Sequence, residues 1–247
     1  MLVFGHRGAR GEAPENTLEG FAYAVAHGTL ALELDVRLTA DRRLAVIHDA
    51  TVDRTTNATG PVASFTAAEL AKLDARAGVA WPQPVRVPLL EDVLQAHGAR
   101  LRLAIELKTD TPERLEQVCA ALVSHLEAHR PRAVTATSFD PAALEIMRRR
   151  APHVPRAFIG AYDSSAFLET ALRLECRQAD VQLSRGSAAA VTQAQAAGLR
   201  VVGWPGNTAE HVHALLEWGV DGITSDYPGR TIALLRERGV ANEDDWS

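Results

Sequence analysis

The chain has 247 residues, of which 47% are hydrophobic and 23% are charged, a composition typical of a globular protein with a large buried core. This composition excludes a disordered tail, a collagen-like fibre and a small disulfide scaffold. The net charge of −5, from 26 Lys and Arg against 31 Asp and Glu, comes without a basic cluster. It argues against a nucleic-acid partner and favours small solutes as ligands.

Short aliphatic or β-branched runs alternate with segments of helical period along the whole chain, which is typical of a parallel sheet with helical crossovers. They predict eight strands, at residues 2–5, 31–38, 101–107, 133–137, 156–160, 179–183, 199–204 and 221–224. Helices are predicted at 16–26, 112–128 and 141–150, and glycines are expected to end helices at Gly28, Gly198, Gly219 and Gly239. Eight strands close a barrel, so we predict one α/β domain over residues 1–247 with the TIM (β/α)8 fold.

One region interrupts this alternation. About fifty residues separate a short predicted strand at 44–48 from the strand at 101–107, and their joints are rich in Thr, Gly and Pro. Two short helical patterns, at 66–73 and 88–97, lie within them. Because long loops in compact domains usually serve as lids or binding loops, we interpret residues 49–100 as a small insertion after the second strand that caps the barrel mouth.

The two cysteines and the amino terminus indicate neither a metal or disulfide site nor a targeting segment. Cys119 and Cys176 form no C-x-x-C pair and are expected to be buried thiols. The first residues lack the charged and apolar regions of a signal peptide, and no later stretch has the roughly 18 apolar residues of a membrane span. We therefore expect a cytoplasmic protein without a stable membrane anchor.

Ionisable residues gather where predicted strands end, the place where barrel enzymes build their active sites. They are His6, Arg7, Glu33, Asp35, His48, Glu106 and Lys108. Alternate side chains on a strand share one face, so Glu33 lies beside Asp35, and Glu106 beside Lys108. Two carboxylates on one face of a buried strand are costly unless a cation or hydrogen-bond donors neutralise them.

Each of these residues alone also fits a structural role. A lone histidine at a strand end is more often structural, and an E-x-D pair alone could belong to a salt-bridged barrel layer. The convergence of three carboxylates, two histidines and two cations at one end of the barrel favours an active site. The other histidines are expected to be surface or packing residues, namely His27, His97, His125, His129, His153, His211 and His213.

This set suits metal-assisted phosphoryl transfer. Hard cations such as Mg²⁺ and Ca²⁺ prefer carboxylate oxygens, and a set without cysteine is wrong for structural zinc. Arg7 and Lys108 could contact phosphate oxygens, Arg7 through two bonds and Lys108 as a point charge. Two histidines that titrate near neutral pH could act as an acid and base pair.

These residues resemble the glycerophosphodiester phosphodiesterase family. The resemblance covers nearly the whole chain and rests on H-R-G at His6, P-E-N-T at Pro14, E-x-D at Glu33, H-D at His48, D-R-T-T at Asp53, E-x-K at Glu106, Ser138-Phe139 and Trp204. It implies a (β/α) barrel with a small insertion after the second strand. It also implies a divalent metal ion, Mg²⁺ or Ca²⁺, on Glu33, Asp35 and Glu106.

The resemblance further implies that His6 and His48 are the catalytic pair, and that Arg7, Lys108 and Trp204 contact the substrate. One stretch departs from the family, which often has V-x-x-W-T-V-N where this chain has V-V-G-W-P-G-N at residues 201–207. Proline fixes φ and removes a backbone donor, so the loop conformation and the preference for the alcohol at this stretch stay open.

The expected activity is hydrolysis of a small-molecule glycerophosphodiester to sn-glycerol 3-phosphate and a free alcohol. Our hypothesis is that His6 and His48 first form a cyclic 1,2-phosphate, using the C2 hydroxyl of the substrate as the nucleophile. Two alternatives are a lysophospholipase D or phospholipase C-like enzyme acting on lipid, and a phosphate-binding barrel without turnover. The alcohol group, the choice of Mg²⁺ or Ca²⁺ and the oligomeric state stay open.

Overall fold

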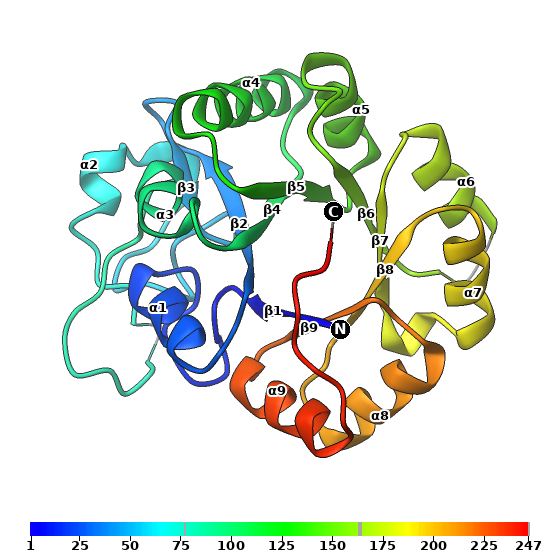
Figure 1. Ribbon diagram of the computed structural model, residues 1–247. Helices are drawn as coiled ribbons and strands as arrows, with labels where there is room; N and C mark the ends of the chain where they lie inside the picture. Colours follow the sequence, from blue (N-terminus) through cyan, green and yellow to red (C-terminus); the bar gives the residue numbers. More distant parts are fainter. Residues whose placement is uncertain (77, 163–164, 247) are drawn as a thin grey trace.

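The computed structural model describes residues 1–76, 78–162 and 165–246, and within them the chain forms a closed barrel with helices outside it (Figure 1). Eight parallel strands form the barrel: β1 (Leu2–His6), β2 (Ala31–Leu38), β4 (Arg102–Leu107), β5 (Ala133–Ser138), β6 (Arg156–Gly160), β7 (Gln178–Gln182), β8 (Arg200–Trp204) and β9 (Gly222–Ser225). Every bound lies within one residue of the predicted one. The predicted TIM (β/α)8 fold is confirmed.

The barrel closes because β1 pairs in parallel with both β2 and β9. A ninth strand among the described residues, β3 (Leu44–Val46), runs antiparallel on β2, with Val36 opposite Val46. The sequence predicted this strand to extend to His48, which was wrong. The chain leaves the sheet after Val46, so His48 lies two residues beyond the strand end.

The helices of the outer ring follow the strands, and their bounds depend on the caps at their ends. They are α1 (Leu18–Ala26), α3 (Leu90–His97), α4 (Pro112–His129), α5 (Pro141–Arg150), α6 (Ser165–Arg173), α7 (Ala188–Ala196), α8 (Ala209–Trp218) and α9 (Pro228–Glu237). The prediction that α1 begins at residue 16 was wrong. Asn16 has a φ of 55°, and the Thr17 hydroxyl accepts the Gly20 amide at 3.0 Å, so Thr17 caps the helix.

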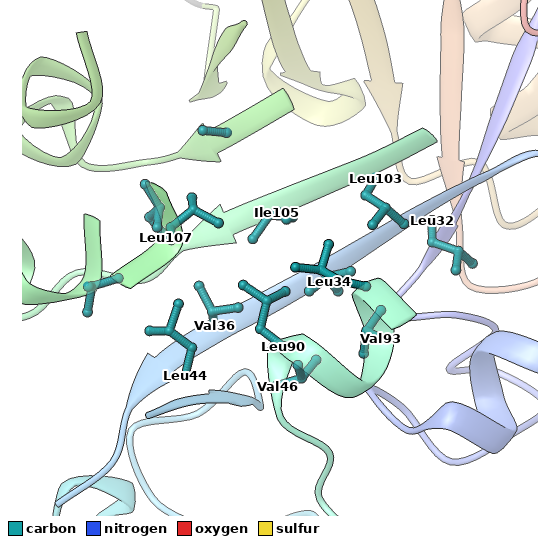
Figure 2. Packing of buried hydrophobic residues seen from close by; sticks show 14 of the residues in the cluster. Leu32, Leu34, Val36, Leu44, Val46, Leu90, Val93, Leu103, Ile105 and Leu107 are labelled. Atoms are coloured by element: carbon teal, nitrogen blue, oxygen red, sulfur yellow. The ribbon is translucent and has the colours of Figure 1, made fainter. Parts of the chain in front are cut away.

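The core lies mainly between the barrel and its helices. Leu34 of β2 and Ile105 of β4 point outward and pack near Leu90 of α3 (Figure 2). All three side chains are fully buried, and each contributes about 1.5–3 kcal/mol through removal from water. Because neighbouring side chains alternate, the same strands turn Glu33, Asp35 and Glu106 toward the inside of the barrel.

The segment between β3 and β4 has a small core of its own. Here lie the short helix α2 (Ala67–Leu70), capped by Thr66, and the 3₁₀ turn η1 (Val62–Ser64). Ile47, Val52, Leu70 and Val85 pack together in this small core. Helices α2 and α3 are therefore both shorter than the helices predicted at 66–73 and 88–97. Closure of the mouth by residues 49–100 stays a prediction.

The other end of the barrel is covered by the C-terminal segment, which runs from α9 to the centre of the ring (Figure 1). Trp246 lies against Phe4, with ring centroids 5.5 Å apart, and the guanidinium carbons of Arg102 and Arg200 lie 5.5 and 5.1 Å from its ring. Asp244 pairs with Arg102 at 3.0 Å. This end of the barrel is therefore filled by packed side chains.

Candidate active site

The first barrel strand brings His6 and Arg7 to the mouth through a tight turn. Arg7 and Gly8 have φ values of 50° and 88°. Glycine is required at position 8, because a Cβ there would lie 2.8 Å from the carbonyl carbon of Gly20 in α1. The Arg7 amide donates to Glu33 Oε2 at 3.1 Å, which fixes the turn to the next strand.

Three buried carboxylates meet just below this turn. Glu33 and Asp35 come from β2, and Glu106 of β4 stands directly opposite Asp35 in the sheet. One oxygen from each side chain lies within 4.8 Å of one oxygen from each of the others. The strand alternation read from the sequence therefore brings these three residues together as expected.

Burial and mutual repulsion make it costly to ionise all three carboxyl groups, and their pKa values reflect this cost. Burial and the charge of Asp35 raise the pKa of Glu33 well above its usual range and that of Glu106 to about 7. Burial acts on Asp35 in the same direction, but the charges of Lys108 and Arg7 outweigh it and lower the pKa of Asp35. Burial and the neighbouring charge thus favour the protonated forms of Glu33 and Glu106, and a bound cation would compete with these protons.

The residues present fit a hard divalent cation. All the donors are carboxylate oxygens, the ligand type that Mg²⁺ and Ca²⁺ prefer. Ligand oxygens at about 2.3–2.6 Å from one Ca²⁺ are at most about 5 Å apart, which matches the spacing of the cluster. Asp35 Oδ1 is buried and accepts no hydrogen bond from any described residue, although Lys108 Nζ forms an ion pair with it at 3.3 Å. Such an oxygen is an expected metal ligand.

Two cations flank the cluster. Lys108 Nζ lies 3.3 Å from Asp35 Oδ1, and Arg7 Nε lies 3.2 Å from Asp35 Oδ2. Arg7 also donates from Nη1 to Glu15 Oε1 at 3.0 Å, and Asn16 donates to Asp35 Oδ2 at 2.8 Å. Fixed cations of this kind can hold a phosphate group whose charge increases during reaction.

His6 is supported by residues from the opposite end of the chain. Its Nδ1 lies 2.5 Å from Oδ1 of Asp226, the residue that directly follows β9. Its Nε2 lies 3.8 Å from Glu33 Oε2. Asn207 donates to Asp226 Oδ2 at 2.8 Å and accepts the Asp226 amide at 2.9 Å. Burial lowers the pKa of His6, although Asp226 acts in the opposite direction.

His48 has a separate carboxylate partner. Its Nδ1 lies 2.6 Å from Asp49 Oδ1, and Arg54 donates to Asp49 Oδ2 at 2.6 Å. Burial lowers the pKa of His48, although the Asp35 and Asp49 carboxylates oppose it. When Nδ1 of a histidine is fixed by a carboxylate, Nε2 is the nitrogen available for proton transfer. Both rings therefore have the arrangement that an acid or a base needs.

Aromatic side chains lie next to Lys108. Trp204 at the end of β8 contacts Phe139 edge to face, with centroids 6.1 Å apart, and Lys108 Nζ lies 6.0 Å from the centre of the Phe139 ring. Phe139 is 46% exposed. Trp204 Nε1 is buried without a hydrogen bond from the described residues. These rings offer an apolar surface next to Lys108.

The loop in which the chain departs from the family pattern still holds its asparagine in the site. Gly206 is packed so closely that a Cβ there would lie 2.1 Å from Ile223 Cγ2. Its carbonyl accepts the hydroxyls of Ser225 and Thr231 at 2.9 and 2.8 Å. This packing places Asn207 against Asp226 despite Pro205, whose peptide bond to Trp204 is cis.

Sequence reasoning missed the roles of Asp226, Asn207 and Arg54. Asp226 is the residue directly after the last barrel strand, so its position resembled that of the predicted residues. Nothing in the local sequence indicated that it would face His6. Glu15 and Asn16 belong to the P-E-N-T motif, but their contacts with Arg7 and Asp35 were not predicted.

Comparisons with known proteins identify the family of this chain. Residues 6–230 match the sequence profile of the Glycerophosphoryl diester phosphodiesterase family. The chain belongs to this family. Its match includes all the site residues described above and confirms both the expected resemblance and the expected class of enzyme. Among the described residues, no helix combines the length and the apolar character that a bilayer crossing requires.

Curated relatives of this phosphodiesterase match it along nearly their whole length. A glycerophosphodiester phosphodiesterase from Caldanaerobacter subterraneus subsp. tengcongensis is 34% identical over 248 residues, which cover 96% of this chain and 99% of the relative. A glycerophosphodiester phosphodiesterase from Bacillus altitudinis is 31% identical over 244 residues, which cover 95% of this chain and 98% of the relative. The similarity is thus not confined to one motif.

Solved structures of other family members are similar as well. A phosphodiesterase from Oleispira antarctica, in complex with the product sn-glycerol-3-phosphate, has a TM-score of 0.88 at 29% identity, covering 96% of this chain and 97% of that one. A glycerophosphodiester phosphodiesterase from Agrobacterium tumefaciens has a TM-score of 0.83 at 28% identity, covering 96% and 99%.

Proposed function

We propose that this phosphodiesterase hydrolyses small-molecule glycerophosphodiesters to sn-glycerol 3-phosphate and a free alcohol, with the help of Mg²⁺ or Ca²⁺. The observation that carries the proposal is the pair His6 and His48, each with its Nδ1 on a carboxylate, beside three carboxylates that fit a cation. The product held by the Oleispira antarctica structure supports the same substrate class.

Glu33, Asp35 and Glu106 would hold the cation. A divalent ion there would neutralise phosphate charge and lower the pKa of a coordinated hydroxyl. Arg7 and Lys108 lie within 3.3 Å of Asp35, so both can contact a phosphate placed on the cluster. Trp204 would contact the substrate through its face or its Nε1 donor.

His6 and His48 would divide the proton transfers. One imidazole takes the proton from the C2 hydroxyl, whose oxygen then bonds to phosphorus. The other gives its proton to the departing alcohol as the P–O bond breaks, which leaves a cyclic 1,2-phosphate. Water opens the ring with the two roles exchanged. A neighbouring hydroxyl held against phosphorus supplies an effective molarity of roughly 10⁵ M or more, so no protein nucleophile is needed.

The substrate panel that tests this proposal contains glycerophosphocholine, glycerophosphoethanolamine, glycerophosphoglycerol and a lysolipid. Formation of sn-glycerol 3-phosphate is followed enzymatically, with and without a chelator. We expect metal-dependent product from at least one soluble diester. Turnover of the lysolipid alone would instead assign the protein to lipid substrates, and no product from any of the four would exclude the proposed activity. A cytoplasmic location stays a prediction.

A further inference from the structure

Arg54 stands at the start of the 49–100 insertion and makes three bonds to two carboxylates. Its Nε donates to Asp49 Oδ2 at 2.6 Å, while Nη1 and Nη2 donate to the two oxygens of Glu15 at 2.7 and 2.9 Å. The side chain of Arg54 is 46% exposed, whereas that of Glu15 is only 10% exposed. Such a paired arrangement fixes a guanidinium far better than one ion pair does.

These bonds join two parts of the site that are distant in sequence. Asp49, the first carboxylate, holds His48 Nδ1 at 2.6 Å. Glu15, the second, lies in the loop after β1 and accepts Arg7 Nη1 at 3.0 Å. A continuous series of charged contacts therefore runs from the imidazole of His48 to the guanidinium of Arg7.

The support of His6 has a different construction. Asp226 directly follows β9, its Oδ2 accepts the amide of Asn207 at 2.8 Å, and Arg10 Nε lies 3.5 Å from its Oδ1. Asp49 is outside the regular strands and helices, and its second oxygen is held by Arg54. The carboxylate of His48 is thus held by an arginine bonded at 2.6 Å, whereas the carboxylate of His6 is held chiefly by its two hydrogen bonds with Asn207.

We propose that Arg54 is a positioning residue, which orients His48 by fixing Asp49 against Glu15. The inference rests on the proposed phosphodiesterase function. Arg54 has a planar fork of donors that bonds to both carboxylates in a fixed geometry, whereas lysine would present one compact charge without these paired bonds. Arg7 also contacts Asp35 directly, at 3.2 Å, so we expect phosphate binding to persist in an Arg54 variant.

The test compares Arg54→Ala and Arg54→Lys with Arg76→Ala. Arg76 pairs with Asp74 in the same insertion and is similarly exposed, so its variant controls for loss of a surface ion pair. We expect both Arg54 variants to lose about 10²-fold in kcat, because a displacement of about 1 Å is sufficient for such a loss. Their KM and their affinity for sn-glycerol 3-phosphate should change less than threefold, and Arg76→Ala should match the wild type.

Guanidinium chloride at about 10 mM, far below denaturing concentrations, should restore activity to Arg54→Ala and leave Arg76→Ala unchanged, with NaCl as the ionic control. A kcat of Arg54→Ala equal to that of Arg76→Ala, or equal effects of guanidinium on both variants, would overturn the positioning role. These outcomes presuppose an active wild type. A wild type without activity on any glycerophosphodiester would overturn the proposed function itself, so the two failures are distinguishable.

Discussion

His6 Nδ1 lies 2.5 Å from Asp226 Oδ1, although 220 positions separate the two residues in the chain. They meet because β1 and β9 pair in parallel, with Gly5 opposite Ser225, and this pairing closes the barrel. His6 is the last residue of β1 and Asp226 is the first residue after β9. The pairing that closes the barrel therefore also brings these two side chains together. The barrel therefore supplies one of the two imidazoles with its carboxylate.

Replacement of Asp226 should harm catalysis more than binding. We expect Asp226→Ala to lower kcat by about 10²-fold or more, because His6 loses the group that fixes its Nδ1, while KM changes little. Asp245→Ala, which removes an exposed carboxylate, is the control. Steady-state kinetics check this, and a kcat of Asp226→Ala within threefold of the control would speak against a supporting role.

The barrel could be predicted from the sequence because each strand carries its own pattern. The bounds of the eight barrel strands were right within one residue, since buried runs of Val, Ile and Leu have few alternatives in a fold where strands and helices alternate. Ends that depend on caps were less predictable. Helix α1 begins later than predicted because the Asn16 side chain donates to Asp35 and Thr17 caps the helix instead.

The candidate site was predictable where it followed from strand alternation. Glu33 and Asp35 had to share one face of β2, and Glu106 had to lie at the same end of the next parallel strand. The contacts of Asp226 and Arg54 could not be predicted in this way. They depend on closure of the ring and on the path of an insertion, which one-dimensional spacing does not encode.

Stability of the metal-free protein should depend on pH through Glu106. Its folded-state pKa is about 7, because of burial and the charge of Asp35, against an ordinary value of 4.5. The folded state therefore holds a proton that the unfolded chain has released. The stability from this proton is complete at low pH and is lost as pH rises through about 7, a change of roughly 3 kcal/mol.

Thermal unfolding with a chelator, at about pH 6 and about pH 8, tests this dependence. We expect the lower Tm at the higher pH, and a larger rise in Tm on addition of Mg²⁺ or Ca²⁺ there, since the cation replaces the proton. In Glu106→Gln the pH dependence should be smaller. A change in Tm between pH 6 and pH 8 that is the same in Glu106→Gln as in the metal-free wild type would contradict the assignment.

The C2 hydroxyl of the substrate should be required for fast turnover. A 2-deoxy analogue of the preferred diester should still bind, because the proposed contacts of Arg7 and Lys108 are with the phosphate, and should react at least about 10²-fold more slowly. Binding by calorimetry and turnover by ³¹P NMR check the two parts. Rapid cleavage of the analogue would show direct attack by water and exclude the cyclic phosphate.

Trp246 should stabilise the fold without taking part in catalysis. Trp246→Ala is expected to lower the free energy of unfolding by about 3 kcal/mol, because the buried ring fills the barrel end between Phe4 and the two arginines. Trp246→Phe should lower the free energy of unfolding by less than half as much as Trp246→Ala does. Urea denaturation measures both, and kcat well below the unfolding transition should stay near the wild-type value. Equal stability of Trp246→Ala and wild type would contradict this packing role.

The most direct test of the account is the rate of sn-glycerol 3-phosphate formation from a glycerophosphodiester by the wild type, His6→Ala, His48→Ala and His213→Ala, each with and without EDTA. His213 lies exposed on α8 and serves as the matched control. The account predicts that wild type and His213→Ala turn over at equal, EDTA-sensitive rates, and that either of the other replacements costs about 10²-fold or more. Full activity after exhaustive chelation, or a His6→Ala or His48→Ala enzyme as fast as His213→Ala, would contradict it.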